Sequence, residues 1–497
     1  MGTSPLQFRL SRSAVGSLSA GLAVLLALSS FAPAQDPAAG SKQLEEIARP
    51  RASGDLHFKM LGTLSCSSVN CHGGQSSSNA RVRKSEEIHH WLANDPHAGA
   101  RDLLDSLRYQ TILNVVAAGQ DRAQVQSRCN QCHDPAGASE LGNYTLAQAI
   151  SCETCHGNAE KWIGKHFERG VSRAQLTALG MTDTKNLADR AAMCAKCHVG
   201  SRDHDMNHDM IAAGHPPLRF EQAAYEDLIK YKHWNDGPAR LEKQDYQVQL
   251  WAAGQTASAK ARLDLLSARA EQLLPKSADE PKQAKQIWTE FAEFSCFSCH
   301  QKILPDPVAE STTKGSPVWS RWNLTFAGQL QANDSKLRAS LLDLSSQRMS
   351  IDASKLIELS DSAHRGLSAA QTNEPLNRQK LLELVHASLQ SPESDWETRS
   401  QQYLALSAIV RAQHDELAKA EFLGRIGPAH ASERSAIQQL SQKLNQLGEA
   451  LRFERPAQDV APKGLILIDE PVRFRENRGQ LGTDLLDLAK QLHDPKS

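Results

Sequence analysis

The sequence predicts a mainly α-helical protein with little regular sheet, in which a region rich in cysteine and histidine is followed by a helical bundle. Apolar residues recur at helical spacing through most of the second half of the chain, whereas the alternating pattern of strands is scarce. All ten cysteines fall into pairs that are followed by histidine. Only 40% of the 497 residues are hydrophobic and 5% are aromatic, so we expect something other than apolar side chains to fill part of the interior.

The N-terminal residues have the features of an export signal. Arg9 and Arg12 precede an apolar stretch of small residues over 14–31, and the tripeptide Ala-Pro-Ala at 32–34 offers a cleavage site. We therefore expect a signal peptide over 1–34 and a periplasmic mature protein with no membrane span. An uncleaved signal anchor is the alternative. The formal net charge of −1 argues against nucleic acid as a partner.

Four of the cysteine pairs follow the pattern Cys-x-x-Cys-His. This pattern attaches a c-type haem, because the two thiols add to the vinyl groups at one porphyrin edge and the adjoining histidine reaches the iron. Zinc sites also use paired cysteines, but four pairs that each continue directly into histidine favour haem. The predicted attachment and proximal residues are Cys129, Cys132 and His133; Cys152, Cys155 and His156; Cys194, Cys197 and His198; and Cys296, Cys299 and His300.

The remaining pair has four residues between its cysteines. Because the vinyl positions of a porphyrin are fixed, the extra residues between Cys66 and Cys71 must bulge outward, and the serines and asparagine there suit a loop. His72 follows directly and no cysteine is left over as another partner, so the sequence predicts a fifth haem. A disulfide or an unmodified pair is the alternative. We therefore expect five covalently bound haems c.

Each haem iron needs a second axial ligand, for which histidine is the candidate type. The chain has nineteen histidines, many more than the five that follow cysteine pairs. Two histidines on one iron are typical of electron-relay cytochromes with lower potentials, whereas methionine ligation raises the potential. Met206 and Met210 are minority candidates, and His215, held in a Gly-His-Pro turn, is favoured over its neighbours. The distal candidates on this basis are His57, His90, His208 and His215.

The stretch 203–209 has two histidines among three aspartates. His204 and His208 are four residues apart and would share one face of a helix, so that together with the aspartates they allow a small metal site. The alternative is that one or two of these histidines are haem ligands and that the aspartates are solvated.

The order of the motifs resembles the tetrahaem cytochrome c-554 group of nitrifying bacteria. Trp91 precedes an Asp-Pro-His-Ala tetrapeptide that contains His97, and two further motifs follow close together. Another histidine, His166, lies ten residues beyond the third motif, and the fourth motif comes after it. The resemblance covers about residues 57–220.

The resemblance implies haems that pack as close stacked pairs. It also implies that His97 and His166 are distal ligands and that the haem at His133 has an open iron face. Two features depart from the tetrahaem pattern, namely the expanded first motif and the fifth motif at Cys296.

Two functions fit these observations. The favoured one is electron transfer between redox partner proteins through about five haems, most of them with two histidine ligands. The alternative is a multihaem oxidoreductase in which one open iron acts on a small nitrogen or sulfur compound. No catalytic residue is assigned.

The chain divides into four predicted segments. They are a signal peptide (1–34), a pentahaem cytochrome domain (35–310), a helical bundle (311–455) and a C-terminal extension (456–497) with a short strand at 465–468. A loop rich in proline, serine, threonine and glycine marks the main boundary. The C-terminal helices either form a docking or oligomerisation surface or pack on the haem region. The predicted helices are 221–233, 241–274, 284–294, 335–348, 353–371, 376–390, 396–421, 433–452 and 481–493.

Overall fold

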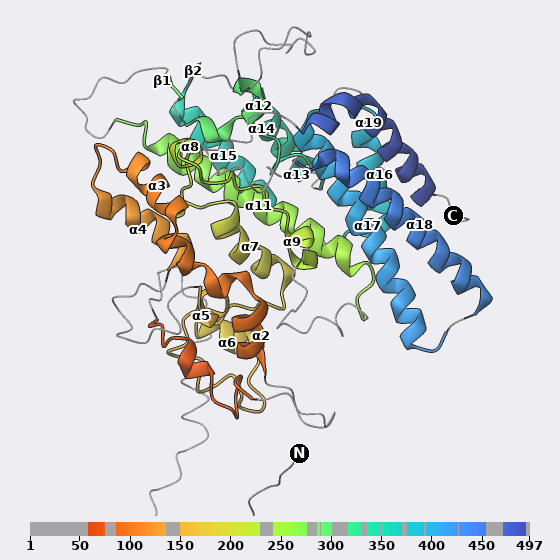
Figure 1. Cartoon of the computed structure of the whole chain (residues 1–497), viewed down its shortest axis with the longest axis horizontal. Coiled ribbons are helices and arrows are strands. Elements are labelled where there is room, and N and C mark those ends of the chain that lie inside the picture. The colour runs from red at the N-terminus through yellow and green to blue at the C-terminus, as the bar shows by residue number, and fades with distance from the viewer. Residues whose placement is uncertain are drawn as a thin grey trace, which may run out of the picture. The chain divides into compact units, whose positions relative to one another are not determined.

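The structure is a computed structural model, and the protein is mainly α-helical in it, as the sequence predicts (Figure 1). Strands in the described part of the chain form one two-residue antiparallel pair, β1 (Gln286–Ile287) and β2 (Ser350–Ile351). The predicted signal peptide, the predicted strand at 465–468 and His57 lie outside the described residues. The structure describes residues 58–74, 86–135, 150–228, 242–275, 286–288, 290–300, 317–330, 335–346, 350–369, 375–391, 394–425, 427–453 and 471–493.

Short helices make up the region of the first four motifs. Several begin at a polar residue whose side chain accepts a hydrogen bond from a free backbone N–H of the first turn, such as Ser106, Asp121 and Asn186. Three of the helices, α4, α5 and α7, end at a motif histidine. The elements are η1 (Thr63–Cys66), α2 (Glu87–Asn94), η2 (Pro96–Gly99), η3 (Arg101–Asp105), α3 (Leu107–Val116), α4 (Arg122–His133), α5 (Cys152–His156), α6 (Arg173–Ala178), α7 (Leu187–His198), α8 (His208–Ala212) and α9 (Gln222–Leu228).

Longer helices follow, and α14 to α18 fall on the five helices predicted for the bundle, which confirms that part of the sequence analysis. The elements are α11 (Tyr246–Glu271), η4 (Phe291–Glu293), α12 (Cys296–Cys299), α13 (Ala327–Leu330), α14 (Ser335–Ser346), α15 (Ala353–Ala369), α16 (Arg378–Leu389), α17 (Trp396–Phe422), α18 (Pro428–Leu451) and α19 (Val472–His493). None of the helices within the described ranges combines the length and the apolar character that a membrane crossing requires.

Helix α11 is buried along much of its length and connects the motif region to the C-terminal helices. It packs against α7 and α9 of the motif region and against α15 and α17 of the bundle. At Gly254 a Cβ atom would lie 2.4 Å from the Cβ of Gln222, so glycine permits the close approach of α9 and α11. The position of α7, which ends in the fourth motif, is therefore fixed by the same helix that supports the bundle.

Apolar burial is unevenly distributed along the chain. One large cluster joins Trp251 of α11 to Leu406 of α17 and Leu485 of α19, and a second joins the latter half of α11 to α14 and α15. In the motif region the clusters are small, for example the one around Leu113 and Met210. Small apolar clusters bury too little surface to stabilise a domain by themselves. The motif region therefore fits the expectation that bound groups fill part of its interior, while the predicted boundary after residue 310 stays a prediction.

The helix predicted over 284–294 is wrong in its described part. Its backbone instead pairs with two distant segments, because β1 lies against β2 and Phe294 bridges to Trp319. Trp288 and Phe294 are buried, but the backbone that carries them is extended. Only Phe291–Glu293 forms a 3-10 turn. The terminal helix also differs, since α19 begins nine residues before the predicted start, with non-helical backbone at Asn477.

Candidate haem-binding site

Four motif histidines each face a histidine from another part of the chain. Two imidazoles on opposite sides of one iron would have ring centres about 6 Å apart, given two metal–nitrogen bonds of about 2.0 Å and an offset of about 1.1 Å from each nitrogen to its ring centre. The observed spacings match this distance, so the residues fit a haem between each pair. The ring-centre separations are 6.2 Å for His72 and His166, 5.8 Å for His97 and His198, 6.3 Å for His133 and His215, and 6.2 Å for His208 and His300.

The other ring nitrogen is already engaged in five of these eight histidines. A carbonyl or carboxylate oxygen can only accept, so each Nδ1 bonded to one carries the proton and each Nε2 keeps the lone pair that a metal needs. Partners of this kind also fix the orientation of metal-binding imidazoles. The Nδ1 contacts are His97 to the Asp95 carboxylate (2.8 Å), His166 to the Ile163 carbonyl (2.8 Å), His215 to the Pro216 carbonyl (2.8 Å), His72 to the Glu87 carboxylate (3.2 Å) and His133 to the Ala100 carbonyl (3.3 Å).

Burial favours the neutral form of one ring in each of two pairs. Burial lowers the pKa of His198 and of His215, which disfavours the protonated form that could not bind a metal. The hydrogen bond to Asp95 instead raises the pKa of His97, as expected for an imidazole whose N–H faces a carboxylate.

The pairing bears on the open iron face that the resemblance implies at His133. The ring of His215 lies opposite His133, and its Nδ1 is bonded to its own Gly-His-Pro turn. His133 therefore has a facing imidazole like the other three paired motif histidines, and the geometry does not support an open iron at this position. The four pairs include every motif histidine except His156.

Two of the other histidine candidates are placed differently. His90 directs its Nε2 to the Glu86 carboxylate at 3.3 Å, so the atom that a ligand would use is occupied. His204 and His208 do not share a helix, because Asn207 caps α8 and the helix begins only at His208. The two histidines of the predicted small metal site therefore do not share a helical face, and His208 faces His300.

Thiols of different motifs lie close enough to interact. The neighbouring Cys152 thiol of the third motif lowers the pKa of Cys66 in the first to about 6, and Cys66 raises that of Cys152. The neighbouring Cys132 thiol of the second motif lowers the pKa of Cys197 in the fourth to about 4. Cys132, Cys197 and His204 all lie within 4.8 Å of one another. Because each thiol marks one porphyrin edge, haems at these motifs would be neighbours, first with third and second with fourth.

Glu153, inside the third motif, holds this motif against the first. Its buried carboxylate accepts backbone N–H groups from Leu61 (2.9 Å), Gly62 (2.6 Å) and Ala159 (2.7 Å). Such charge-assisted bonds are stronger than neutral ones. The segment that leads into Cys66 is therefore fixed over the third motif, which explains the contact of the two thiols.

The expanded first motif keeps a hydrogen bond that the fifth motif also has. In the fifth motif the His300 N–H donates to the Cys296 carbonyl at 2.8 Å, and in the first the His72 N–H donates to the Cys66 carbonyl at 3.2 Å. The two extra residues loop outward, and Gly73 packs so closely on the loop that a Cβ would lie 1.9 Å from the Ser67 oxygen. The first cysteine and the histidine are therefore joined by the same backbone hydrogen bond in both motifs, despite the two extra residues.

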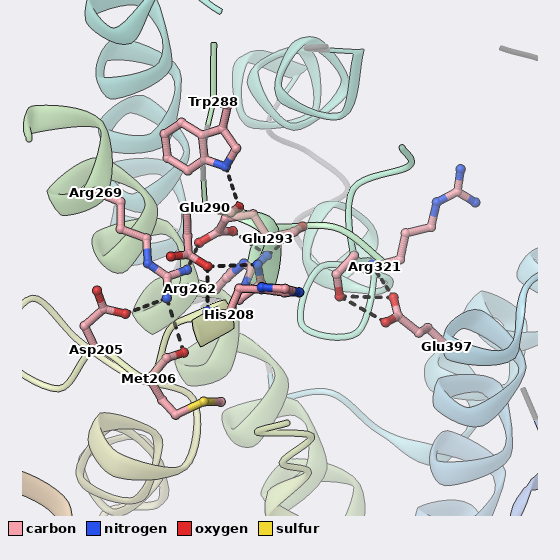
Figure 2. A network of polar contacts seen from close by, with 12 residues as sticks. Asp205, Met206, His208, Arg262, Arg269, Trp288, Glu290, Glu293, Arg321 and Glu397 are labelled. Carbon is pink, nitrogen blue, oxygen red and sulfur yellow. Dashed lines mark hydrogen bonds and ion pairs between the residues drawn. The ribbon is translucent and has the colours of Figure 1, made fainter. Parts of the chain in front are cut away.

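A buried charge network positions the fifth motif and His208 (Figure 2). Arg262 and Arg269 of α11 both pair with Glu293, which is fully buried three residues before Cys296. Arg269 also donates to the Asp205 carboxylate at 2.5 Å (Figure 2). The His208 N–H donates to the Glu290 carboxylate at 2.9 Å, and the indole of Trp288 donates to the Glu290 carbonyl at 2.7 Å. The network thus joins the two segments that supply the fifth pair.

Sequence reasoning missed these supporting residues. The Asp95 side chain had a local signal, because an aspartate two residues before His97 can accept from that residue's own backbone N–H and ring. Glu153, Glu290 and Glu293 had none, since their partners lie far away in the chain.

Comparison with known proteins agrees with this geometry over part of the chain. Residues 65–157 match the family model described as cytochrome c554 and c-prime. No curated protein and no solved structure compared with the chain matches it. The matched segment contains the first three motifs and Glu153, whose contacts bring the first and third motifs together. The match supports a c-type cytochrome of the cytochrome c554 type, with covalently bound haem c and a role in electron transfer.

Proposed function

We propose that the chain is an exported electron-relay protein that carries five haems c and passes electrons between redox partner proteins in the periplasm. The observation that carries the proposal is the set of four histidine pairs at the spacing of two axial ligands. Bound haem supplies one-electron chemistry at the iron. At four of the five motifs the chain would offer two imidazoles to the iron, which favours electron transfer over substrate binding at those four positions.

Contacts between the motifs support one order of electron transfer through the protein. The Cys66–Cys152 and Cys132–Cys197 contacts link the first motif to the third and the second to the fourth. Cys155 of the third motif interacts electrostatically with Cys194 of the fourth. We infer the sequence first, third, fourth and second motif.

The fifth motif comes after the second motif in this order. His208 and His215 lie seven residues apart in one segment, and they face the histidines of the fifth and second motifs respectively. Cys71 of the first motif and Cys299 of the fifth are exposed, whereas the other eight attachment cysteines are half-buried. The two ends of the proposed order are therefore the places where a redox partner would reach a haem edge.

Haem counting and carbon monoxide binding test this proposal. The exported protein is purified, its mass and pyridine haemochrome spectrum give the number of haems, and the dithionite-reduced spectrum is recorded with and without carbon monoxide. We expect five haems and no carbon monoxide adduct at the four paired positions. A count of four would reject the fifth haem, and an adduct on two or more haems would reject the bis-histidine relay in favour of a redox enzyme.

A further inference from the structure

An arginine enclosed by aromatic rings lies against the fifth motif. The Arg219 guanidinium carbon is 4.8 Å from the ring centre of Trp396 and 5.5 Å from those of Phe297 and Phe453. The guanidinium also donates to the sulfur of Cys296 at 3.5 Å. Arg219 is thus a cation held over three aromatic faces with its N–H aimed at an attachment cysteine.

Three separate parts of the chain build the aromatic enclosure. Phe297 lies between the two cysteines of the fifth motif, Trp396 begins α17 and Phe453 follows α18. The indole of Trp396 donates to the Leu451 carbonyl at 2.9 Å and stacks on Trp322 at 5.5 Å. Two of the three rings therefore come from the C-terminal part of the chain, one from the start of α17 and one from the segment after α18, which gives this part a direct role beside the fifth motif.

The charge of Arg219 has a nearby acidic group. Glu397, the next residue after Trp396, interacts electrostatically with both Arg219 and Cys296. Its carboxylate is buried and accepts the N–H of Arg321 at 2.7 Å (Figure 2). Burial raises the pKa of Glu397 and so disfavours its charged form. Burial therefore opposes full neutralisation of the positive charge of Arg219 by this carboxylate.

We propose that Arg219 sets the reduction potential of the haem attached at Cys296 and Cys299, raising it by holding a fixed positive charge against the Cys296 sulfur. This inference rests on the proposed function, which places a haem at the fifth motif. Reduction adds one negative charge to a haem, so a nearby cation stabilises the reduced form. Arg219 acts through its positive charge beside the attachment sulfur and is not an iron ligand.

A unit charge within about 10 Å of a redox centre, at an effective dielectric constant of about 20, changes the ratio of reduced to oxidised centre by on the order of tenfold. A tenfold change corresponds to about 59 mV for a one-electron couple. The guanidinium touches the attachment sulfur itself, so an effect of this size is expected at one haem and a much smaller one at the others.

Spectroelectrochemical titration of the whole haem-loaded protein tests the proposal. Arg219→Gln and Arg219→Met remove the charge, Arg219→Lys keeps it, and Arg434→Gln removes an exposed arginine of α18 that pairs with Glu421. We expect one of five components to shift to lower potential by about 59 mV in both neutral variants, and no such shift in the lysine or Arg434 variants.

Two results would overturn the proposal. One is a neutral variant that retains five haems with all potentials unchanged. The other is loss of the fifth haem in both neutral variants but not in Arg219→Lys, which would assign Arg219 to haem attachment instead of tuning. A wild-type protein whose peptide with Cys296 and Cys299 carries no haem, as shown by mass spectrometry of a proteolytic digest, would reject the haem that the proposed function places there, so the two failures are distinguishable.

Discussion

Replacing His215 with alanine should open exactly one iron, that of the haem at His133, and no other. The ring of His215 is 6.3 Å from that of His133, and its Nδ1 is bonded to the Pro216 carbonyl at 2.8 Å, which leaves Nε2 as the ligand atom. Alanine provides no replacement donor. The reduced variant should therefore bind carbon monoxide at about one haem in five more than the wild type does, measured by difference spectroscopy against a pyridine haemochrome count.

The matched control is His90→Ala. His90 is also a half-buried histidine of the motif region, but its Nε2 faces the Glu86 carboxylate at 3.3 Å. We expect this variant to have the carbon monoxide response of the wild type. If His215→Ala binds no additional carbon monoxide, or if His90→Ala responds like it, the inference from ring spacing to ligand pairing is incorrect.

Three further substitutions test the supporting residues. Glu153→Gln should lower the free energy of unfolding by about 2–3 kcal/mol, because the backbone N–H groups before the first motif would no longer donate to a charged carboxylate. Urea titrations followed by circular dichroism measure this, and a change below measurement error would argue that Glu153 does not hold the two motifs together. Glu293→Gln leaves Arg262 and Arg269 without their shared buried carboxylate, so a loss of about 3–5 kcal/mol is expected by the same assay, and an unchanged midpoint would contradict it. Gly157→Ala should reduce the yield of fully haem-loaded protein, because φ is 82° at this position and a Cβ would lie 2.1 Å from a backbone oxygen. A normal yield with normal stability would show that the third motif tolerates the strain.

The motifs and the bundle were predictable because their signals are local. Cys-x-x-Cys-His spacing is set by the geometry of one porphyrin edge, and α14 to α18 follow from apolar residues at helical spacing. The helix predicted around Trp288 was wrong. The apolar residues of this segment are buried through strand pairing and a backbone bridge with distant residues, which local periodicity does not reveal.

The histidine pairs were only partly predictable. His97, His166, His208 and His215 were all candidates, but their assignment to particular motif histidines depends on tertiary contacts such as that between α8 and the segment before Cys296. The prediction that His204 and His208 share a helix was wrong, because α8 begins only at His208. The Asn207 side chain caps the helix by accepting the Met210 N–H.

The histidine pairs also form a set of cross-links. His72 to His166, His97 to His198, His133 to His215 and His208 to His300 each close a loop of roughly 80–100 residues, and each loop overlaps the next along the chain. A covalent bridge that closes a loop of this length restricts the unfolded chain by about 4–5 kcal/mol. An iron anchored to the chain and held by both imidazoles would act in the same way. Four interlocked loops would then stabilise a region whose apolar clusters are small, much as disulfides stabilise small exported domains.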